Sequence, residues 1–292
     1  MAQHTTQAGH VVLRDGEAQA VLDALHGGAV RELRCGAVDL LRRSAPGAGA
    51  DPFDLASFPM VPYVNRIAHG RLAAGMQRLQ LAPNWSGDPH PLHGQGWRAP
   101  WRVVEQSVTA AVLEYEGGGD EWPWRYRARQ EFRLGADGLS LQLSVLNLSR
   151  ETMPAALGVH PYFPDAAGAR VITDAARVWR TDASALPLEE VPVPPHWAFD
   201  AGRPAASVPL DHCFTHWSGQ ALITWAHHGV LLQAAGCRFL HVYVPRGGAC
   251  LCLEPQTAAT GAFNRSADEV AQLPSGAQLS MTVTLRLVTG AA

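Results

Sequence analysis

Five short stretches of this 292-residue sequence contain titratable side chains among otherwise apolar residues. They are P-Y-V-N-R-I-A-H-G-R-L (62–72), H-P-L-H-G-Q-G-W (90–97), G-V-H-P-Y-F (158–163), V-P-L-D-H-C-F (208–214) and L-C-L-E-P-Q-T (251–257). An imidazole exchanges protons near neutral pH, and a carboxylate in a buried apolar run needs a partner or a raised pKa. His160 and Glu254 are therefore candidates for an acid–base pair.

Each of these residues also has an ordinary structural role as its alternative. His160 could be a packed residue at a strand end, and Glu254 could belong to a structural ion pair where its strand leaves the sheet. His93 could stabilise a turn, Asp211 could cap one, and Arg66 could form an ion pair at a sheet rim. No single residue of this set decides between structure and function.

The sequence gives weaker evidence for a metal site or a covalent nucleophile than for an acid–base site. H-P-L-H (90–93) and H-C-F-T-H (212–216) have tolerable metal-ligand spacings, but no H-E-x-x-H motif is present, so we expect no catalytic metal. The G-x-S-x-G motif of serine hydrolases is also missing. Asp211 and Glu254 could form the carboxylate pair of a glycosidase, which would leave the histidines and the arginine without a task.

Composition narrows the possible chemistry further. All 23 basic residues are arginines, so the chain has no amine for a Schiff base, a pyridoxal phosphate linkage, a G-K-[ST] phosphate loop or a lysine base. The net charge of -3 provides no basic surface field for nucleic acid or anionic lipid, and we expect neither as a partner.

The remaining composition favours a cytoplasmic protein. The N-terminus has no signal-peptide pattern, and no run approaches the length of an apolar membrane span. The five cysteines, at positions 35, 213, 237, 250 and 252, are odd in number and include no C-x-x-C pair. We interpret them as reduced and mostly buried thiols.

The elements that must position the candidate residues have the pattern of β-strands. Apolar and polar residues alternate at 111–116, 124–134, 139–145, 239–244 and 279–288. This alternation is typical of strands with one buried and one wetter face. Turn signals at 117–120, 135–138, 165–168 and 245–248 separate the strands.

We therefore expect an all-β protein, one large antiparallel β-sandwich with long loops that fills residues 1–292 as a single domain. No amphipathic helix of more than two or three turns is expected. The Pro-rich segment 187–209 is predicted to be an irregular connection, and 46–52 an exposed loop.

Five ordered motifs resemble those of the aldose 1-epimerase (galactose mutarotase) family. They are N-R-I-A-H-G-R-L, L-H-G-Q-G-W, G-V-H-P-Y-F, L-D-H-C-F and L-E-P-Q-T, and the resemblance extends from about residue 10 to the strand at 279–288. L-H-G alone is common by chance, whereas the five motifs in order are specific. The resemblance implies a galactose mutarotase-like supersandwich, in agreement with the strand pattern.

By this resemblance Glu254 is the general base and His160 the general acid. The residues matched to substrate binding are Arg66, His93, Asp211 and Asn65. We expect burial to raise the pKa of Glu254 and a nearby carboxylate to keep His160 protonated. The sequence departs from galactose-type members in G-Q-G-W-R-A-P-W and at Pro161, where those members usually have serine. The resemblance thus implies the chemistry more firmly than the sugar.

The implied activity is that of an isomerase that interconverts the α and β anomers of a free aldose such as glucose or galactose. Ring opening removes a proton from the C1 hydroxyl and gives one to the ring oxygen, so a base and an acid suffice without a cofactor or metal. The expected partner is a small monosaccharide, and the expected state is a monomer or a homodimer.

Two other functions stay open. A hexose 6-phosphate 1-epimerase would need arginines near the sugar's C6, and Arg98 and Arg102 follow the L-H-G motif. A non-catalytic carbohydrate-binding β-sandwich would keep the pocket but has no need of an acid–base pair. Trp85, Trp97 and Trp197 offer faces for a sugar ring, with core packing as their alternative.

Overall fold

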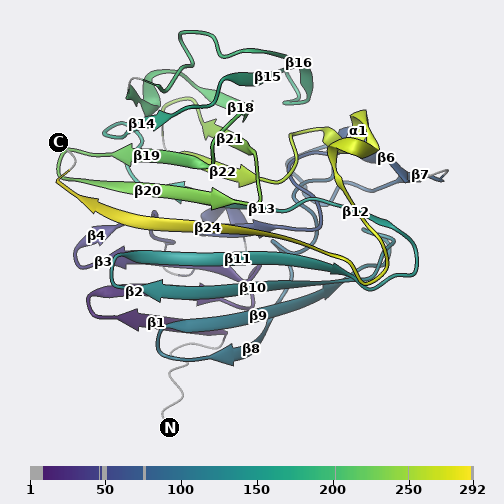
Figure 1. Cartoon of the computed structure of the whole chain (residues 1–292), viewed down its shortest axis with the longest axis horizontal. Helices are drawn as coiled ribbons and strands as arrows, with labels where there is room; N and C mark the ends of the chain where they lie inside the picture. The colour runs from purple at the N-terminus through teal and green to yellow at the C-terminus, as the bar shows by residue number, and fades with distance from the viewer. Residues whose placement is uncertain are drawn as a thin grey trace.

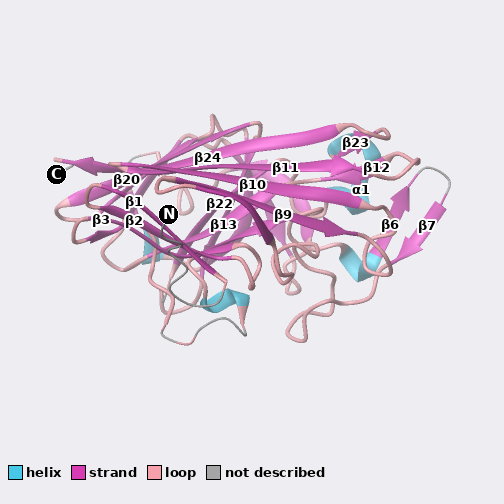
Figure 2. Cartoon of the chain, turned by 90° about the horizontal axis from the view of Figure 1, so that it is seen from below, coloured by secondary structure: helices cyan, strands magenta, loops and turns pink. Residues whose placement is uncertain are grey.

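The computed structural model describes residues 9–45, 47, 51–74, 77–200, 202–248 and 250–290. Within these ranges nearly all regular structure is β-strand, and two large antiparallel sheets lie face to face (Figures 1 and 2). The all-β fold with a large antiparallel sandwich, predicted from the alternation of apolar and polar residues, is confirmed.

The larger sheet supplies the floor of the site described below. In spatial order its strands are β1 (His10–Asp15), β2 (Ala18–Asp23), β3 (Ala29–Cys35), β5 (Ser57–Met60), β13 (Gly158–Phe163), β22 (Leu251–Gln256), β21 (Phe239–Val244), β18 (Leu210–Thr215), β15 (Arg177–Thr181) and β16 (Pro187–Pro192). The short β4 (Val38–Asp39) pairs with β3. Strands distant in sequence, such as β13 and β22, thus become neighbours at the centre of the sheet.

The second sheet closes the other side of the core. Its strands are β17 (Arg203–Pro204), β14 (Arg170–Thr173), β19 (Gln220–Thr224), β20 (His228–Ala235), β24 (Gln278–Thr289), β11 (Gly138–Asn147), β10 (Tyr126–Gly135), β9 (Ala110–Gly117) and β8 (Arg102–Gln106). Two small two-stranded sheets pair β12 (Met153–Ala155) with β23 (Ala271–Leu273) and β6 (Arg71–Ala74) with β7 (Gln77–Gln80).

Helical structure within the described ranges is short, as the sequence predicts. It consists of α1 (Ala262–Arg265) and the 3₁₀ turns η1 (Pro52–Asp54), η2 (Ala68–Gly70), η3 (Ala205–Ser207) and η4 (Ala267–Glu269). None of the helices in these ranges combines the length and apolar character that a membrane crossing requires.

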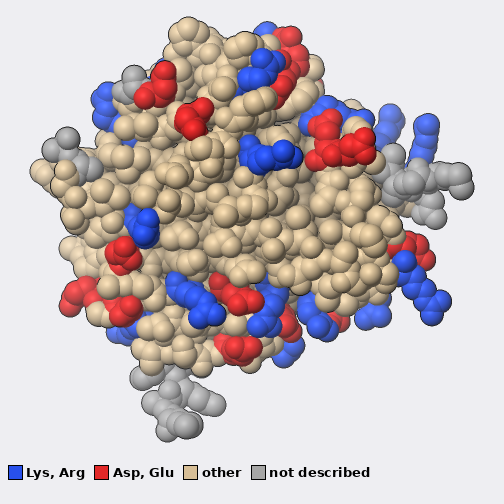
Figure 3. All heavy atoms as spheres, in the orientation of Figure 1, with Lys and Arg blue, Asp and Glu red and all other residues tan. Residues whose placement is uncertain are grey.

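The predicted strands at 111–116, 124–134, 139–145, 239–244 and 279–288 correspond to β9, β10, β11, β21 and β24. In the smaller sheet, Phe132, Leu141 and Val283 lie opposite one another on β10, β11 and β24 and are all buried in the core. The outward-facing residues of β10 are charged, and Arg129 on this strand donates to Glu114 on β9 at 2.8 Å. Basic and acidic groups are interspersed over the part of this face formed by β8, β9 and β10 (Figure 3).

Two loop predictions need comment. The segment 187–209 is not irregular throughout, because β16 pairs with β15 and β17 pairs with β14 at the sheet edges. Edge strands tolerate proline since one side of the strand needs no hydrogen-bonding partner. In the loop predicted at 46–52, positions 46 and 48–50 lie outside the described residues. All five cysteines are free and buried, as predicted.

Strands β13 and β22 are buried on both faces. Because side chains alternate along a strand, Phe163 and Leu253 face the sandwich core while His160 and Glu254 lie on the opposite face, under the connecting loops. The polar residues that interrupt the apolar text of these two strands therefore share one face of the larger sheet.

Candidate active site

A cavity of about 390 Å³ opens above the centre of the larger sheet, over β13, β22, β21 and β18. All six residues predicted from the sequence line it: Glu254, His160, Arg66, His93, Asp211 and Asn65. Seven further lining residues are Arg42, Phe53, Leu92, Tyr162, His241, Tyr243 and Cys250. The fold therefore brings the predicted side chains together from five separate stretches of the chain.

The register of the sheet places three titratable residues side by side. His160 faces Phe58 across β13 and β5, and His241 faces Glu254 across β21 and β22. Nε2 of His160 lies 3.2 Å from Oε1 of Glu254. The predicted acid and base share one cavity, in direct contact on neighbouring strands.

Burial dominates the electrostatics of Glu254. The carboxylate is 1% exposed, and burial raises its pKa to about 7 despite the opposing positive charge of His241. The predicted rise in the pKa of Glu254 has this physical cause. A carboxyl group with such a pKa can both accept and release a proton near neutrality.

The expectation that a carboxylate keeps His160 protonated is wrong. Burial, reinforced by the positive charges of His241 and Arg42, lowers the pKa of His160 to about 3. The ring is enclosed by aromatic neighbours, at 4.6 Å from the Phe58 ring and stacked at 4.7 Å on Tyr162. His160 is therefore a neutral imidazole, with its orientation fixed by packing.

The charged histidine of the site is His241, which the sequence analysis did not single out. Burial opposes its ionisation, but Glu254 and then Asp211 raise its pKa to about 10. Its Nε2 donates to Oδ1 of Asp211 at 2.8 Å, and its Nδ1 lies 3.3 Å from the Thr260 hydroxyl oxygen. The hydrogen bond from His241 keeps the pKa of Asp211 below its usual value, although burial alone would raise it.

Arg66 and Asn65 enter the cavity from the segment after β5. The Arg66 guanidinium donates from Nε to Oδ2 of Asp88 at 2.7 Å, and its backbone N–H donates to Oδ1 of Asn65 at 2.9 Å. Asn65 has a φ of 51°, in the left-handed region that asparagine tolerates better than most residues. Nη1 of Arg66 also donates to Oδ1 of Asn65 at 3.4 Å, which leaves Nη2 for a ligand in the cavity.

His93 is positioned by a neighbouring loop. It also has a left-handed backbone, at φ 57°, and the following Gly94 approaches the Val61 carbonyl so closely that a Cβ would lie 2.1 Å from its oxygen. The Asn84 side chain donates to the carbonyls of Leu92 and Gly94, each at 2.9 Å, and accepts from the Leu92 N–H at 2.8 Å. One amide group thus clamps both sides of His93.

Two ring nitrogens of the residues that line the cavity lack a hydrogen-bond partner within the described residues. Nδ1 of His93 and Nδ1 of His160 are buried and have no hydrogen-bond partner within the described residues. Burial also lowers the pKa of His93 well below its usual value, so its imidazole is neutral. Buried polar atoms usually have partners, so these two ring nitrogens are exceptions among the described residues.

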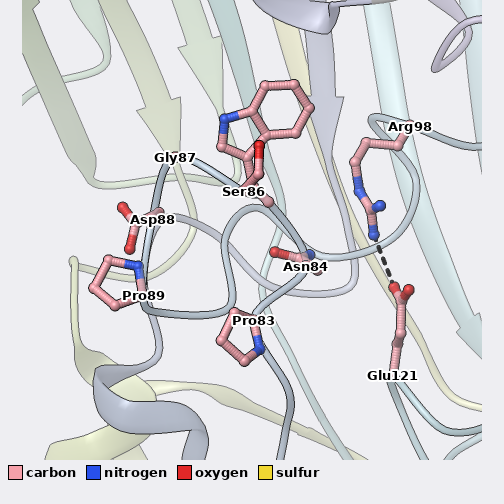
Figure 4. A pocket seen from close by; sticks show the side chains of 9 residues that line it. Pro83, Asn84, Ser86, Gly87, Asp88, Pro89, Arg98 and Glu121 are labelled. Atoms are coloured by element: carbon pink, nitrogen blue, oxygen red, sulfur yellow. Dashed lines mark hydrogen bonds and ion pairs between the residues drawn. The ribbon is translucent and has the colours of Figure 1, made fainter.

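The arginines considered for a 6-phosphate lie elsewhere. Arg98 lines a separate hollow formed by residues 83–89 and pairs with Glu121 at 3.0 Å (Figure 4). The side chain of Arg102 is 71% exposed and pairs with Glu114 on β9 of the smaller sheet. Neither residue lines the cavity above the larger sheet.

Tryptophans contribute packing near the site. Trp97 is fully buried and donates from its ring nitrogen to the Gly94 carbonyl at 3.0 Å, and Trp85 lines the hollow of Figure 4. Trp197 packs 4.3 Å from the His212 ring. The aromatic residues that line the cavity are Phe53, Tyr162 and Tyr243.

Comparison with known proteins identifies the relatives of this chain. The family described as Aldose 1-epimerase matches residues 9–285. YphB, an uncharacterised protein of Escherichia coli strain K12, is 32% identical over 246 residues, which cover 80% of this chain and 84% of YphB.

Solved structures show the same architecture. A candidate aldose 1-epimerase from Escherichia coli K12 superposes with a TM-score of 0.90 at 27% identity, covering 96% of this chain and 99% of that one. A galactose mutarotase-like protein from Clostridium acetobutylicum gives a TM-score of 0.83 at 20% identity over 96% and 95% of the two chains. The latter similarity shows the common fold alone.

The Asn84 clamp leads to a stability prediction. Asn84→Ala removes three hydrogen bonds to the segment around His93, and we expect the free energy of unfolding to fall by about 1.5–4 kcal/mol, measured by urea denaturation. Ser86→Ala, at an exposed position of the same loop, is the matched control and should leave stability within about 0.5 kcal/mol of wild type. Equal stability of the two variants would contradict the clamp.

The charge of His241 leads to a titration prediction. Because this positive charge lowers the pKa of Glu254, His241→Gln should move the carboxyl titration from about 7 to higher pH. The measurement is ¹³C NMR of labelled glutamate side chains, with the Glu254 resonance identified by its absence in Glu254→Gln. His196→Gln, at an exposed position, is the control. An unchanged or lowered midpoint in His241→Gln would contradict the assignment of charge.

Proposed function

The chain belongs to the aldose 1-epimerase family, and we propose that it interconverts the α and β anomers of a free aldose such as glucose or galactose. The observation that carries this proposal is the 3.2 Å contact between Nε2 of His160 and Oε1 of Glu254 inside a lined cavity. A buried carboxylate and a neutral imidazole in contact can exchange protons with a bound hemiacetal.

In the proposed reaction, Glu254 accepts the proton of the C1 hydroxyl while the C1–O5 bond breaks and C1 becomes a carbonyl carbon. Glu254 passes this proton to Nε2 of His160 across their 3.2 Å contact, and the imidazolium so formed gives a proton to O5, which returns both side chains to their starting states. The sugar loses one proton at O1 and gains one at O5, so the protein ends unchanged. Rotation about C1–C2 and the reverse steps close the ring as the other anomer.

The lowered pKa of His160 has a consequence for its proposed role. An imidazolium with a pKa of about 3 is a strong acid, so it gives its proton readily to a weakly basic ring oxygen. The low pKa also makes the charged form short-lived. We therefore assign His160 a transient positive charge that forms during the reaction, in place of a resting one.

Four other residues would hold the sugar. Neutral His93 lines the cavity, Nη2 of Arg66 can donate to hydroxyl oxygens, and Asp211 can accept from hydroxyl hydrogens. Asn65 orients Arg66 through its backbone. This scheme needs no cofactor and no metal ion, because the two catalytic side chains supply every proton transfer.

A mutarotase and a non-catalytic sugar-binding protein differ in whether they need an acid–base pair. A non-catalytic sugar-binding protein would have no use for the contact between His160 and Glu254, whereas the mutarotase uses both groups. Location in the cytoplasm, a monomeric or homodimeric state and a single domain stay predictions from the sequence.

Replacing the base tests the proposed function. Glu254→Gln keeps the size of the side chain but removes the proton acceptor, so kcat for mutarotation should fall by about 10²–10⁴-fold. The assay is polarimetry of freshly dissolved α-D-glucose or α-D-galactose, with sugar binding to the variant followed by calorimetry.

The control for this experiment is Glu189→Gln, whose side chain is 58% exposed and pairs with Arg180 at the sheet edge. It should match wild type. An active Glu254→Gln enzyme would remove Glu254 from the role of base. Binding of sugar by wild type without any acceleration would support the non-catalytic alternative.

A further inference from the structure

Arg42 is a cation in the cavity wall that the proposed chemistry does not use. Its guanidinium stacks over the Tyr162 ring, with Cζ 3.6 Å from the ring centroid. It donates to the backbone carbonyls of Phe53 and Leu55 through Nε and Nη2. The group is therefore fixed in position, while Nη1 makes no hydrogen bond within the described part of the chain.

The other cations of the cavity are paired with carboxylates. Arg66 pairs with Asp88 at 2.7 Å and His241 pairs with Asp211 at 2.8 Å. Arg42 forms no ion pair within the described residues, and these include every Asp and Glu of the sequence. A half-buried guanidinium without a counter-charge is costly unless a ligand supplies one.

Asp211 is too distant to neutralise Arg42. In the sheet register, Tyr162 lies opposite Cys252, Cys252 opposite Tyr243, and Tyr243 opposite Asp211. Arg42 stacks on the first residue of this row and Asp211 is the last, so three strand spacings of about 4.8 Å separate them. The unpaired positive charge and the paired Asp211 thus lie at opposite ends of the cavity.

The position of Arg42 relative to His160 places it near the expected C6 substituent of a bound sugar. Tyr162 follows His160 by two residues on the same face of β13, which is a step of about 6.6 Å. If His160 serves the ring oxygen, then C5 and its C6 substituent lie next to that oxygen by covalent connection. A charged group on C6 could therefore extend toward Arg42 while C1 stays at Glu254.

We propose that the preferred substrate is an aldohexose with an anionic group on C6, a carboxylate or a phosphate, recognised by Arg42. This inference rests on the proposed mutarotase chemistry, and it makes the preferred substrate an anionic sugar in place of a neutral free aldose. Arg98 and Arg102, the arginines considered from the sequence for this role, do not line the cavity, whereas Arg42 does.

The experiment measures anomer exchange at equilibrium by ¹H NMR exchange spectroscopy of the anomeric protons. The substrates are galactose and glucose, their uronic acids, and their 6-phosphates. The uronic acids test recognition of a carboxylate on C6, and the 6-phosphates test recognition of a phosphate. For the wild-type protein we expect kcat/KM to be at least about tenfold higher for one anionic class than for the parent neutral sugar, as expected for one charge-assisted hydrogen bond.

Arg42→Gln should reduce this ratio to about one by lowering kcat/KM for the anionic sugar. Arg102→Gln replaces an exposed arginine on the smaller sheet and should retain the wild-type ratio. A cooperative urea unfolding transition of Arg42→Gln shows that the variant is folded, and the wild-type ratio needs no variant at all.

A wild-type ratio of one or below, or an unchanged ratio in Arg42→Gln, would overturn the inference while leaving the mutarotase function in place. Failure of the wild-type protein to exchange the anomers of any of these sugars would overturn the proposed function, and this inference with it.

Discussion

The contact between His160 and Glu254 is the interaction on which the rest of the site depends. Two titratable groups lie 3.2 Å apart on neighbouring central strands, where the sandwich core covers one face and loops cover the other. Burial shifts the pKa of Glu254 up and that of His160 down, which brings a base and a strong transient acid into one place. Neither shift would occur on an exposed sheet.

The charges around this pair follow a spatial order. His241 carries a positive charge between the two carboxylates Glu254 and Asp211, and it limits how far the pKa of Glu254 rises. At the other end of the cavity, Arg42 adds a positive charge that forms no ion pair within the described residues. The cavity thus has a paired end, suited to hydroxyl groups, and an unpaired cationic end, suited to an anion.

Sequence patterns predicted the sandwich because period-two alternation is a local property of each strand. They predicted Glu254 and His160 because these polar residues interrupt apolar stretches of the sequence. The motifs that contain them also occur in the same order in a known family. They missed His241, since its importance comes from the register between β21 and β22, which is not local. The charge on His160 was predicted wrongly for the same reason, and Asn84 was missed because its partners lie in another segment of the chain.

The pH dependence of kcat/KM for anomer exchange tests the central claim most directly. Glu254 must be ionised to accept the C1 proton, and its pKa is about 7. We predict that kcat/KM, corrected for the spontaneous reaction, falls about tenfold per pH unit below neutrality and reaches a plateau above it. A profile that is flat through pH 7, or that falls as the pH rises through it, would contradict the account.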